Sequence, residues 1–315
     1  MQVHRDLDHL PTFRRAVVTI GTFDGVHTGH RHIIRQLQQA AAACAGETVI
    51  VTFDPHPREV LAPHDKSLRL LTTLPEKIRL LSGYGIDHLV VVPFTRAFSE
   101  MPAQSYIKDF LVALFRPHTI IIGYDHRFGH NREGGLELLE LEQERHGYQL
   151  IEIPQQVVHD LTVSSTKIRN NLREGHISVA NELLGYTYFL EGYVVHGDKM
   201  GRKLGYPTAN MQLPDYRKLI PSEGIYAIRV YLSGDLHSLP LDGVMSIGTR
   251  PTFDGEDLRL EAHIFDFDRD IYDQLLRVEL VAYIRGNIKF DKIEALISQM
   301  NQDSLQARQL LAAGS

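Results

Sequence analysis

The fold of the first half of this chain is decided by the stretch GTFDGVHTGH, residues 21–30. A short apolar run rich in β-branched residues, Ala16 to Ile20, precedes it, and the residues from Gly29 to Ala45 follow with the apolar period of a helix. Glycines let the backbone approach a ligand closely, and the first turn of a helix offers free amide groups and a positive dipole end to phosphate. The stretch therefore predicts a phosphate-binding turn between a strand and a helix.

Two histidines in this turn, His27 and His30, are three residues apart and would share one face of the first helical turn. Two imidazoles in that position can donate hydrogen bonds to a triphosphate whose charge grows during attack at one phosphorus. An isolated histidine would be a surface or first-turn residue, but the pattern His-x-Gly-His after Gly-x-Phe-Asp-Gly favours function. A metal site is the other alternative, and it is disfavoured because no third ligand lies nearby at a metal-like spacing.

The rest of the first half alternates short apolar strands with helical patterns. We expect further strands at 48–53, 89–92, 119–122 and 150–153, and helices at 29–45, 75–81, 103–115 and 134–146, with one or two more between 164 and 184. This alternation predicts an α/β domain with a Rossmann-like parallel sheet covered by helices on both faces. Ligands of such sheets bind at the carboxyl ends of the strands, where the loops after Ile20 and Ile122 lie.

The pattern changes near Gly185. Strand-like segments follow at 188–195, 225–232, 244–247, 258–267 and 276–284, separated by turns rich in glycine, proline and aspartate. Antiparallel strands at this spacing predict a small barrel, and residues 291–311 predict a closing amphipathic helix. We therefore expect two domains, residues 1–185 and 186–315.

Length and composition agree with this division, because 315 residues are about twice the usual size of one domain. The formal net charge of −6 argues against a nucleic-acid partner. The single cysteine, Cys44, excludes a disulfide within the chain and fits a reducing compartment. Because no segment reaches the roughly 20 apolar residues of a membrane helix and the N-terminus does not resemble a signal peptide, we expect a soluble, cytoplasmic protein without a membrane partner.

A second motif lies in the second half, GYVVHGDKMGRKLGYPTAN at residues 192–210. Its glycines at 197, 201 and 205 interleave with basic residues, so the loop can wrap phosphates with backbone amides and positive side chains. The spacing is not that of a Walker A loop. The alternative interpretation is a mobile basic hairpin loop.

Together, these motifs resemble a known family. The first half, with TFDPHP at 52–57, GYDHRFG at 123–129 and SSTKIR at 164–169, resembles the His-x-Gly-His nucleotidyltransferase superfamily. More narrowly, it is similar to the FMN adenylyltransferase half of bacterial bifunctional riboflavin kinase/FAD synthetases. GYPTAN at 205–210, GTRPTF at 248–253 and LEAH at 260–263 resemble the riboflavin kinase barrel of the same family. The resemblance extends from about Ala16 to Arg308.

The resemblance assigns roles to individual residues. Binding of ATP for adenylyl transfer is implied for Gly21, Phe23, Asp24, Gly25, His27, His30, Ser164, Ser165, Thr166 and Arg169, with His27 and His30 also catalytic. Binding of the flavin in the same half is implied for Phe53, Pro55, His56, Asp125, His126 and Phe128. Binding of ATP in the kinase half is implied for Gly197, Lys199, Gly201, Lys203, Gly205, Thr208 and Asn210, with Thr208 and Asn210 also holding Mg²⁺. Glu261 corresponds to the catalytic base of the kinase.

The residues alone leave two of these roles open. The 164–169 segment is also explained as an ordinary helix capped by Ser164 or Ser165. Glu261 is also explained as a surface carboxylate on a strand. Three positions depart from the usual family pattern: His126 replaces a phenylalanine, Asp273 replaces a glycine, and Gly286-Asn287 follows Arg285 in place of a proline or acidic pair.

The resemblance implies an enzyme that uses ATP and Mg²⁺ to phosphorylate riboflavin to FMN and then adenylylates FMN to FAD, releasing pyrophosphate. Its expected partners are therefore small molecules, and we expect a monomer or a weak homo-oligomer. Two alternatives are a nucleotidyltransferase for another phosphate-bearing substrate and a flavin- or nucleotide-sensing protein with an inactive kinase half.

Overall fold

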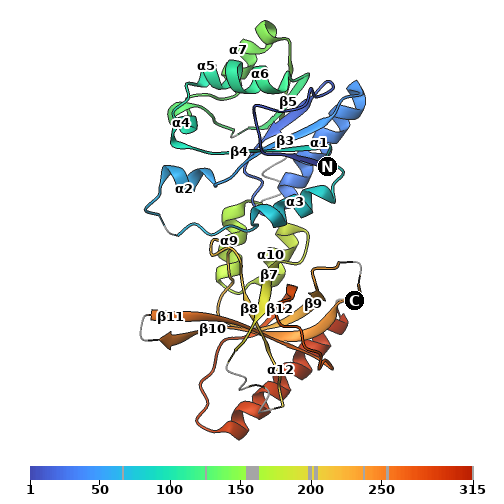
Figure 1. The fold of residues 1–315 in the computed structure, drawn as a ribbon, viewed down its shortest axis with the longest axis vertical. Helices are drawn as coiled ribbons and strands as arrows, with labels where there is room; N and C mark the ends of the chain where they lie inside the picture. The colour runs from blue at the N-terminus through green and yellow to red at the C-terminus, as the bar shows by residue number, and fades with distance from the viewer. Residues whose placement is uncertain are drawn as a thin grey trace. The chain divides into compact units, whose positions relative to one another are not determined.

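The structure is a computed structural model. It describes residues 1–65, 67–124, 126–153, 163–197, 201, 205–236, 238–252 and 255–313. The chain divides into two compact units, Met1–Ser165 and Thr166–Ser315 (Figure 1). Among the described residues, no helix has the length and apolar character needed to cross a membrane.

The first unit is built on a six-stranded parallel sheet in the order β1-β4-β3-β2-β5-β6. Its strands are β1 (Gln2–His4), β2 (Val17–Ile20), β3 (Thr48–Phe53), β4 (His88–Val92), β5 (Thr119–Gly123) and β6 (Gln149–Ile153). This confirms the predicted parallel sheet, with β1 as an additional strand. Strand β1 was not predicted because its three residues, Gln-Val-His, contain no apolar run.

Side chains of the strands alternate between two separate cores. Val18 and Ile20 of β2 belong to one core, which contains Ile107 and Phe115 from the helical segment 103–115, whereas Val17 belongs to the other. The second core takes its helical residues from the helices on the opposite face. Because both faces of the four central strands, β2 to β5, are buried, those strands are apolar almost throughout, which is the pattern that the sequence shows.

The helices lie close to the predicted ranges. On one face are α1 (Thr28–Cys44) and α3 (Leu74–Ser82), and on the other are α5 (Ala103–Ser105), η1 (Tyr106–Val112), α6 (Ala113–Phe115) and α7 (Leu136–His146) (Figure 1). The segment 103–115 has the predicted ends but is a π-helix in its middle. Within the described part of the chain, three short helices were not predicted: α2 (Pro57–Leu61), α4 (Arg96–Ser99) and η2 (His130–Arg132).

The second unit begins with two helices, α9 (Ser165–Arg173, whose first residue ends the first unit) and α10 (Ile177–Leu184). A closed antiparallel barrel follows in the order β10-β11-β8-β7-β12-β9. Its strands are β7 (Phe189–Val195), β8 (Ala209–Gln212), β9 (Gly224–Leu232), β10 (Leu241–Thr252), β11 (Gly255–Ile264) and β12 (Leu275–Arg285). The barrel was predicted, but β8 was not, because its four residues overlap the PTAN motif.

The closing helix α12 (Ile293–Ala313) packs on the barrel through Ala307 and Leu311, four residues apart on one face. An ion pair holds the same helix to the end of β12, because Arg285 donates to both carboxylate oxygens of Asp303 at 2.8 and 2.6 Å. Asp303 is buried, so this two-pronged geometry compensates for the desolvation of its charge.

Candidate functional sites

The turn after β2 lies where the strand order of the sheet reverses. β2 pairs with β3 on one side and with β5 on the other, both in parallel. The chain proceeds from β2 outward through β3 and β4 before it returns to β5. The carboxyl ends of β2 and β5 therefore form the kind of crevice in which open α/β sheets bind ligands.

The backbone of this turn is held in an unusual conformation. Phe23, Gly25 and Val26 have positive φ angles of 47°, 82° and 39°. Left-handed backbone costs about 1–2 kcal/mol for residues with a side chain, so the surroundings must hold Phe23 and Val26 in place. Asp24 contributes to this, because its buried carboxylate accepts from the amides of Leu71 and Thr72 at 3.2 and 3.0 Å. Asp24, predicted to bind ATP, thus shapes the turn through its side chain.

His27 is the N-cap of α1, and its Nδ1 accepts a hydrogen bond from the backbone amide of His30 at 3.4 Å. A ring that accepts at Nδ1 carries the proton of its neutral form at Nε2. The two imidazoles are stacked, with ring centroids 3.7 Å apart and planes 17° apart. Gly29 makes this stack possible, since a Cβ there would lie 3.2 Å from the His27 ring.

His30 is part-buried, and its imidazole packs against Phe23 as well as against His27. Burial, followed by the nearby His27 and Lys77, lowers the pKa of its imidazole well below the usual value. Its Nδ1 is buried and has no hydrogen-bond partner among the described residues. An uncharged imidazole with an unsatisfied buried nitrogen is suited to receive a ligand group.

The other residues predicted for this ATP site lie on both sides of the unit boundary. Gly21 follows β2, and its amide donates to the carbonyl of Val51 at 3.0 Å. Ser165 donates from Oγ to the carbonyl of Asp24 at 3.1 Å, so it lies beside the turn, and Ser164 precedes it. Thr166 and Arg169 lie in α9 within the second unit.

The residues predicted to bind flavin in the first unit fall into different environments. Phe53 belongs to an aromatic cluster with Phe94 and Phe98, at centroid distances of 5.4 and 5.8 Å. Phe94 and Phe98 follow β4 at the same edge of the sheet. Sequence reasoning missed them because Phe94 lies in a short loop and Phe98 in the four-residue helix α4, neither of which has a recognisable pattern. Phe128 is buried and stacks on Tyr106 at 4.8 Å, with the His126 ring 5.8 Å away.

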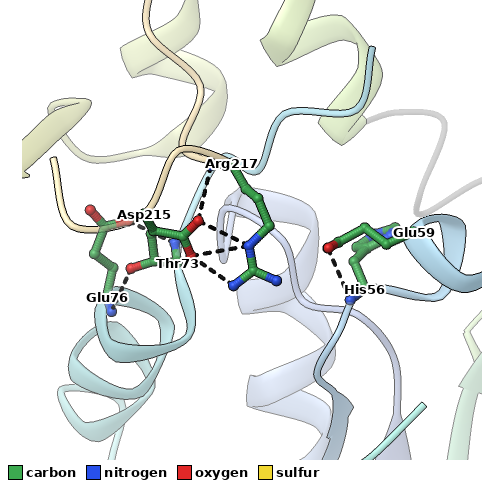
Figure 2. Close-up of polar contacts among 6 residues, drawn as sticks. All are labelled: His56, Glu59, Thr73, Glu76, Asp215 and Arg217. Atoms are coloured by element: carbon green, nitrogen blue, oxygen red, sulfur yellow. Dashed lines mark hydrogen bonds and ion pairs between the residues drawn. The ribbon is translucent and has the colours of Figure 1, made fainter. Parts of the chain in front are cut away.

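Two more of the residues predicted to bind flavin, Pro55 and His56, lie between β3 and α2. His56 caps α2, because its ring accepts from the amide of Arg58. Its own amide donates to the Glu59 carboxylate (Figure 2). Pro55 precedes His56. Asp125 lies outside the described residues.

In the second unit, the barrel brings Thr208, Asn210 and Glu261 together. Thr208 donates from Oγ1 to Oε2 of Glu261 at 3.3 Å. Glu261 of β11 is the direct cross-strand partner of Asn210 in β8. The barrel thereby places a hydroxyl, an amide and a carboxylate close together, although Thr208 and Glu261 are 53 positions apart. The sequence alone could not show that these groups are neighbours.

A side chain would be disfavoured at each of the three predicted glycines of this site, either because of a close neighbour or because of the backbone conformation. A Cβ at Gly197 would lie 2.2 Å from the side-chain amide of Asn210, and one at Gly201 would lie 2.2 Å from the carbonyl oxygen of Tyr206. Gly205 has a φ of +80°, which favours glycine. The predicted phosphate ligands Lys199 and Lys203 lie outside the described residues.

Two cavities of the barrel unit meet at Thr208. One, of about 420 Å³, is lined by Val194, Pro207, Thr208, Ala262 and the loop 267–272. The other, of about 640 Å³, is lined by Thr208, Glu261, His263, Arg285, Asn287, Phe290 and residues of α12. Both volumes are in the usual range for small-molecule sites. A group bound in one cavity can therefore face a group bound in the other across Thr208.

The departures from the family pattern at Asp273 and Asn287 have local explanations. Asp273 has a φ of +60°, a conformation that glycine adopts without strain and aspartate tolerates. Asn287 lines the larger cavity and donates to Glu223 at 3.2 Å and to the carbonyl of Ile247 at 3.1 Å.

Comparison with known families assigns both units to enzymes that transfer nucleotidyl or phosphoryl groups. The FAD synthetase family matches residues 10–167, and the riboflavin kinase family matches residues 184–311. The chain belongs to the family of bifunctional riboflavin kinase/FMN adenylyltransferases.

Individual relatives with the same description match nearly the whole chain. The bifunctional riboflavin kinase/FMN adenylyltransferase of Listeria monocytogenes is 38% identical to this chain, covering 94% of this chain and 92% of the relative. The enzyme of the same description from Escherichia coli strain K12 is also 38% identical, covering 93% and 92%. The one from Bacillus subtilis strain 168 is 32% identical over 93% and 92%.

One solved structure has a similar backbone over nearly the whole chain. It is named as a macrolide-efflux protein from Streptococcus pneumoniae, has a TM-score of 0.84 and 30% sequence identity, and covers 96% of both chains. This likeness supports the backbone arrangement, whereas the family assignment rests on the two family matches and the sequence relatives.

Proposed function

We propose that the two activities of the family are divided between residues 1–185, which transfer the adenylyl group, and residues 186–315, which phosphorylate riboflavin. The chain is a bifunctional enzyme that makes FMN from riboflavin and FAD from FMN, with ATP as co-substrate in both reactions. The observation that carries the kinase assignment is the contact between Thr208 and Glu261 where two cavities meet.

For the kinase reaction, riboflavin is assigned to the larger cavity, because apolar side chains such as Val244, Met245 and Phe290 can pack on the flavin ring while polar ones line the rest. ATP is assigned to the smaller cavity and to the glycine loop, with its γ-phosphate near Thr208. The ribityl hydroxyl attacks the γ-phosphorus, a new O–P bond forms, and ADP leaves. Glu261 takes the hydroxyl proton, while the hydrogen bond from Thr208 orients its carboxylate.

A magnesium ion fits the side chains at this point, because Mg²⁺ prefers oxygen ligands and Thr208 and Asn210 offer a hydroxyl and an amide oxygen beside the Glu261 carboxylate. When bound, it would neutralise charge on the phosphates during transfer. Among the described residues, no group of three or more histidine, cysteine or acidic side chains has a metal-binding arrangement. The assignment to Thr208 and Asn210 therefore depends on neutral oxygen ligands completed by phosphate.

For the second reaction, a phosphate oxygen of FMN attacks the α-phosphorus of ATP and pyrophosphate leaves. The attacking oxygen is already an anion, so no general base is needed, and positioning and charge stabilisation supply the rate. His27 and His30 are assigned as the hydrogen-bond donors to the phosphates. The stacked geometry of these rings and the unsatisfied Nδ1 of His30 support this assignment.

Neither of the two rival functions has a specific observation in its favour. A nucleotidyltransferase for another substrate leaves the barrel with its Thr208–Glu261 contact unexplained. A sensor with an inactive kinase half would not need the carboxylate, hydroxyl and amide to be kept together at the junction of two cavities.

Gly197→Ala should impair the kinase reaction alone. A methyl group at this position would displace the Asn210 side chain, because no Cβ can lie 2.2 Å from it. A displacement of about 1 Å in a catalytic site can cost about 100-fold in rate, so we expect a loss of that order in FMN formation. FAD formation from supplied FMN should be unchanged. Gly83→Ala is a control for the substitution itself, since Gly83 has an ordinary φ of −68° and the nearest atom to a Cβ there would be 3.4 Å away.

The metal assignment is tested by incubating the purified protein with riboflavin and ATP and separating the flavins by chromatography. With Mg²⁺ we expect FMN followed by FAD. With excess EDTA we expect riboflavin to remain, and with Mg²⁺ restored we expect both products again. Formation of FMN at an undiminished rate in EDTA would contradict the metal site at Thr208 and Asn210.

A further inference from the structure

A lysine of the first unit is buried beside the histidine-bearing turn and has no role in the reactions described above. Lys77, in the second turn of α3, is only 6% exposed. Its Nζ donates to the carbonyl oxygen of Thr22 at 2.6 Å and to Oγ1 of Thr52 at 3.3 Å. A buried ammonium group is costly unless it is paired, so a lysine at this position calls for a physical reason.

The contacts of Lys77 converge on one peptide group. Thr52, fully buried at the end of β3, also donates from its hydroxyl to the Thr22 carbonyl, at 3.1 Å. The carbonyl of Thr22 thus accepts two hydrogen bonds, one of them charge-assisted and short. It directly precedes Phe23, whose backbone is in the left-handed region. Lys77 therefore holds the peptide at which the turn toward His27 and His30 begins.

The position of Lys77 is fixed by the hydrogen bonds at the start of α3. Thr73 is the N-cap of this helix, and its side chain and that of Glu76 form a reciprocal capping box (Figure 2). The residues just before the cap, Leu71 and Thr72, give their amides to Asp24. The segment 71–77 thus holds the turn at three places: the Asp24 carboxylate, the Gly25 amide, which donates to Oγ1 of Thr72 at 3.0 Å, and the Thr22 carbonyl.

We propose that Lys77 is a positioning residue for adenylyl transfer, holding the Thr22 carbonyl so that the following turn presents His27 and His30 to the phosphates of ATP. This inference rests on the proposed function of that turn. Lys77 does not need to touch ATP, because its effect passes through the backbone. It also places a positive charge near His30, which helps to keep that imidazole uncharged.

The test compares Lys77→Met, which keeps the length of the side chain but not its charge, with Lys108→Met, which removes an exposed lysine of the same unit. We expect Lys77→Met to lower kcat for FAD formation from supplied FMN about 10- to 100-fold, because misplacement of catalytic groups has effects of this size. FMN formation from riboflavin should stay normal, and circular dichroism with thermal unfolding of the whole protein checks that the first unit is folded. Lys108→Met should leave both reactions unchanged. A kcat for FAD formation within twofold of wild type in folded Lys77→Met protein would overturn the proposal.

A readout independent of turnover is the titration of the His30 ring, followed by NMR. The pKa of His30 is lowered by burial, by His27 and by Lys77, so removal of the Lys77 charge should raise it. Lys108→Met should leave the His30 titration where it is. If Lys77 holds the turn that carries His30, its removal must change the surroundings of that ring, so an unchanged His30 pKa in Lys77→Met would contradict the proposal.

Thr52→Val keeps the test decisive if Lys77→Met does not fold. This substitution removes one of the two hydrogen bonds to the Thr22 carbonyl without removing a charge, and a smaller loss in kcat for FAD formation is expected. Undiminished FAD formation in Thr52→Val would then count against the proposal. His30→Ala separates the two levels of the argument: if it keeps full FAD formation, the proposed site is wrong, whereas a loss in His30→Ala with full activity in the Lys77 and Thr52 variants refutes only the role of Lys77.

Discussion

We expect His30→Ala to lower FAD formation from supplied FMN about 100- to 1,000-fold and to leave FMN formation from riboflavin near the wild-type rate. The size of the loss is that of removing one positioned donor from a developing negative charge. The selectivity follows from the structure, because His30 lies in the first unit, and the Thr208–Glu261 pair lies in the second. The measurement is the rate of each reaction in separate assays, started with FMN and with riboflavin.

His32→Ala is the matched control, since His32 lies on the same helix two residues further on and therefore faces away from His30. It should keep both activities. An equal loss of both reactions in well-folded His30→Ala protein would contradict the separation of the sites. Full FAD formation in that variant would remove His30 from the adenylyl transfer site.

Glu261→Gln has the opposite selectivity. If Glu261 is the base of the kinase, the substitution cuts FMN formation about 100- to 10,000-fold, the usual contribution of general-base catalysis. Glutamine keeps the size of the side chain and an oxygen that can accept from Thr208, so the local structure is preserved while basicity is lost. Riboflavin binding should change little, because the role of the base lies in the transition state.

Asp242→Asn, which removes an exposed carboxylate from a neighbouring barrel strand, should have no effect on either reaction. If Glu261→Gln kept more than about a tenth of the wild-type turnover, a base contribution of the expected size would be excluded. The simpler interpretation of Glu261 as a surface carboxylate of β11 would then be preferred.

Much of the fold was predictable because apolar periodicity reports directly on burial. The sheet of the first unit has buried strands such as β3, whose predicted range of 48–53 coincides with the structure. Elements with weak or overlapping signals were missed. β1 is short and polar, and β8 lies inside a motif whose residues were considered only as ligands.

The candidate sites were predictable to a lesser degree. Sequence spacing placed His27 and His30 on one helical turn, and the structure adds that they stack and that His30 also packs against Phe23. Spacing could not indicate that Asp24 binds the backbone of Leu71 and Thr72, since that contact spans 47 and 48 residues. Spacing also could not indicate a role for Lys77, because its partner Thr22 is 55 residues away in the sequence.

The division of labour within one chain is tested most directly by mixing the two single variants. His30→Ala alone should convert riboflavin to FMN and stop there, and Glu261→Gln alone should leave riboflavin unconverted. In a mixture of the two proteins with riboflavin, ATP and Mg²⁺, FMN released by the first is taken up by the second. The account predicts that FAD appears in the mixture, and accumulation of FMN without FAD would contradict it.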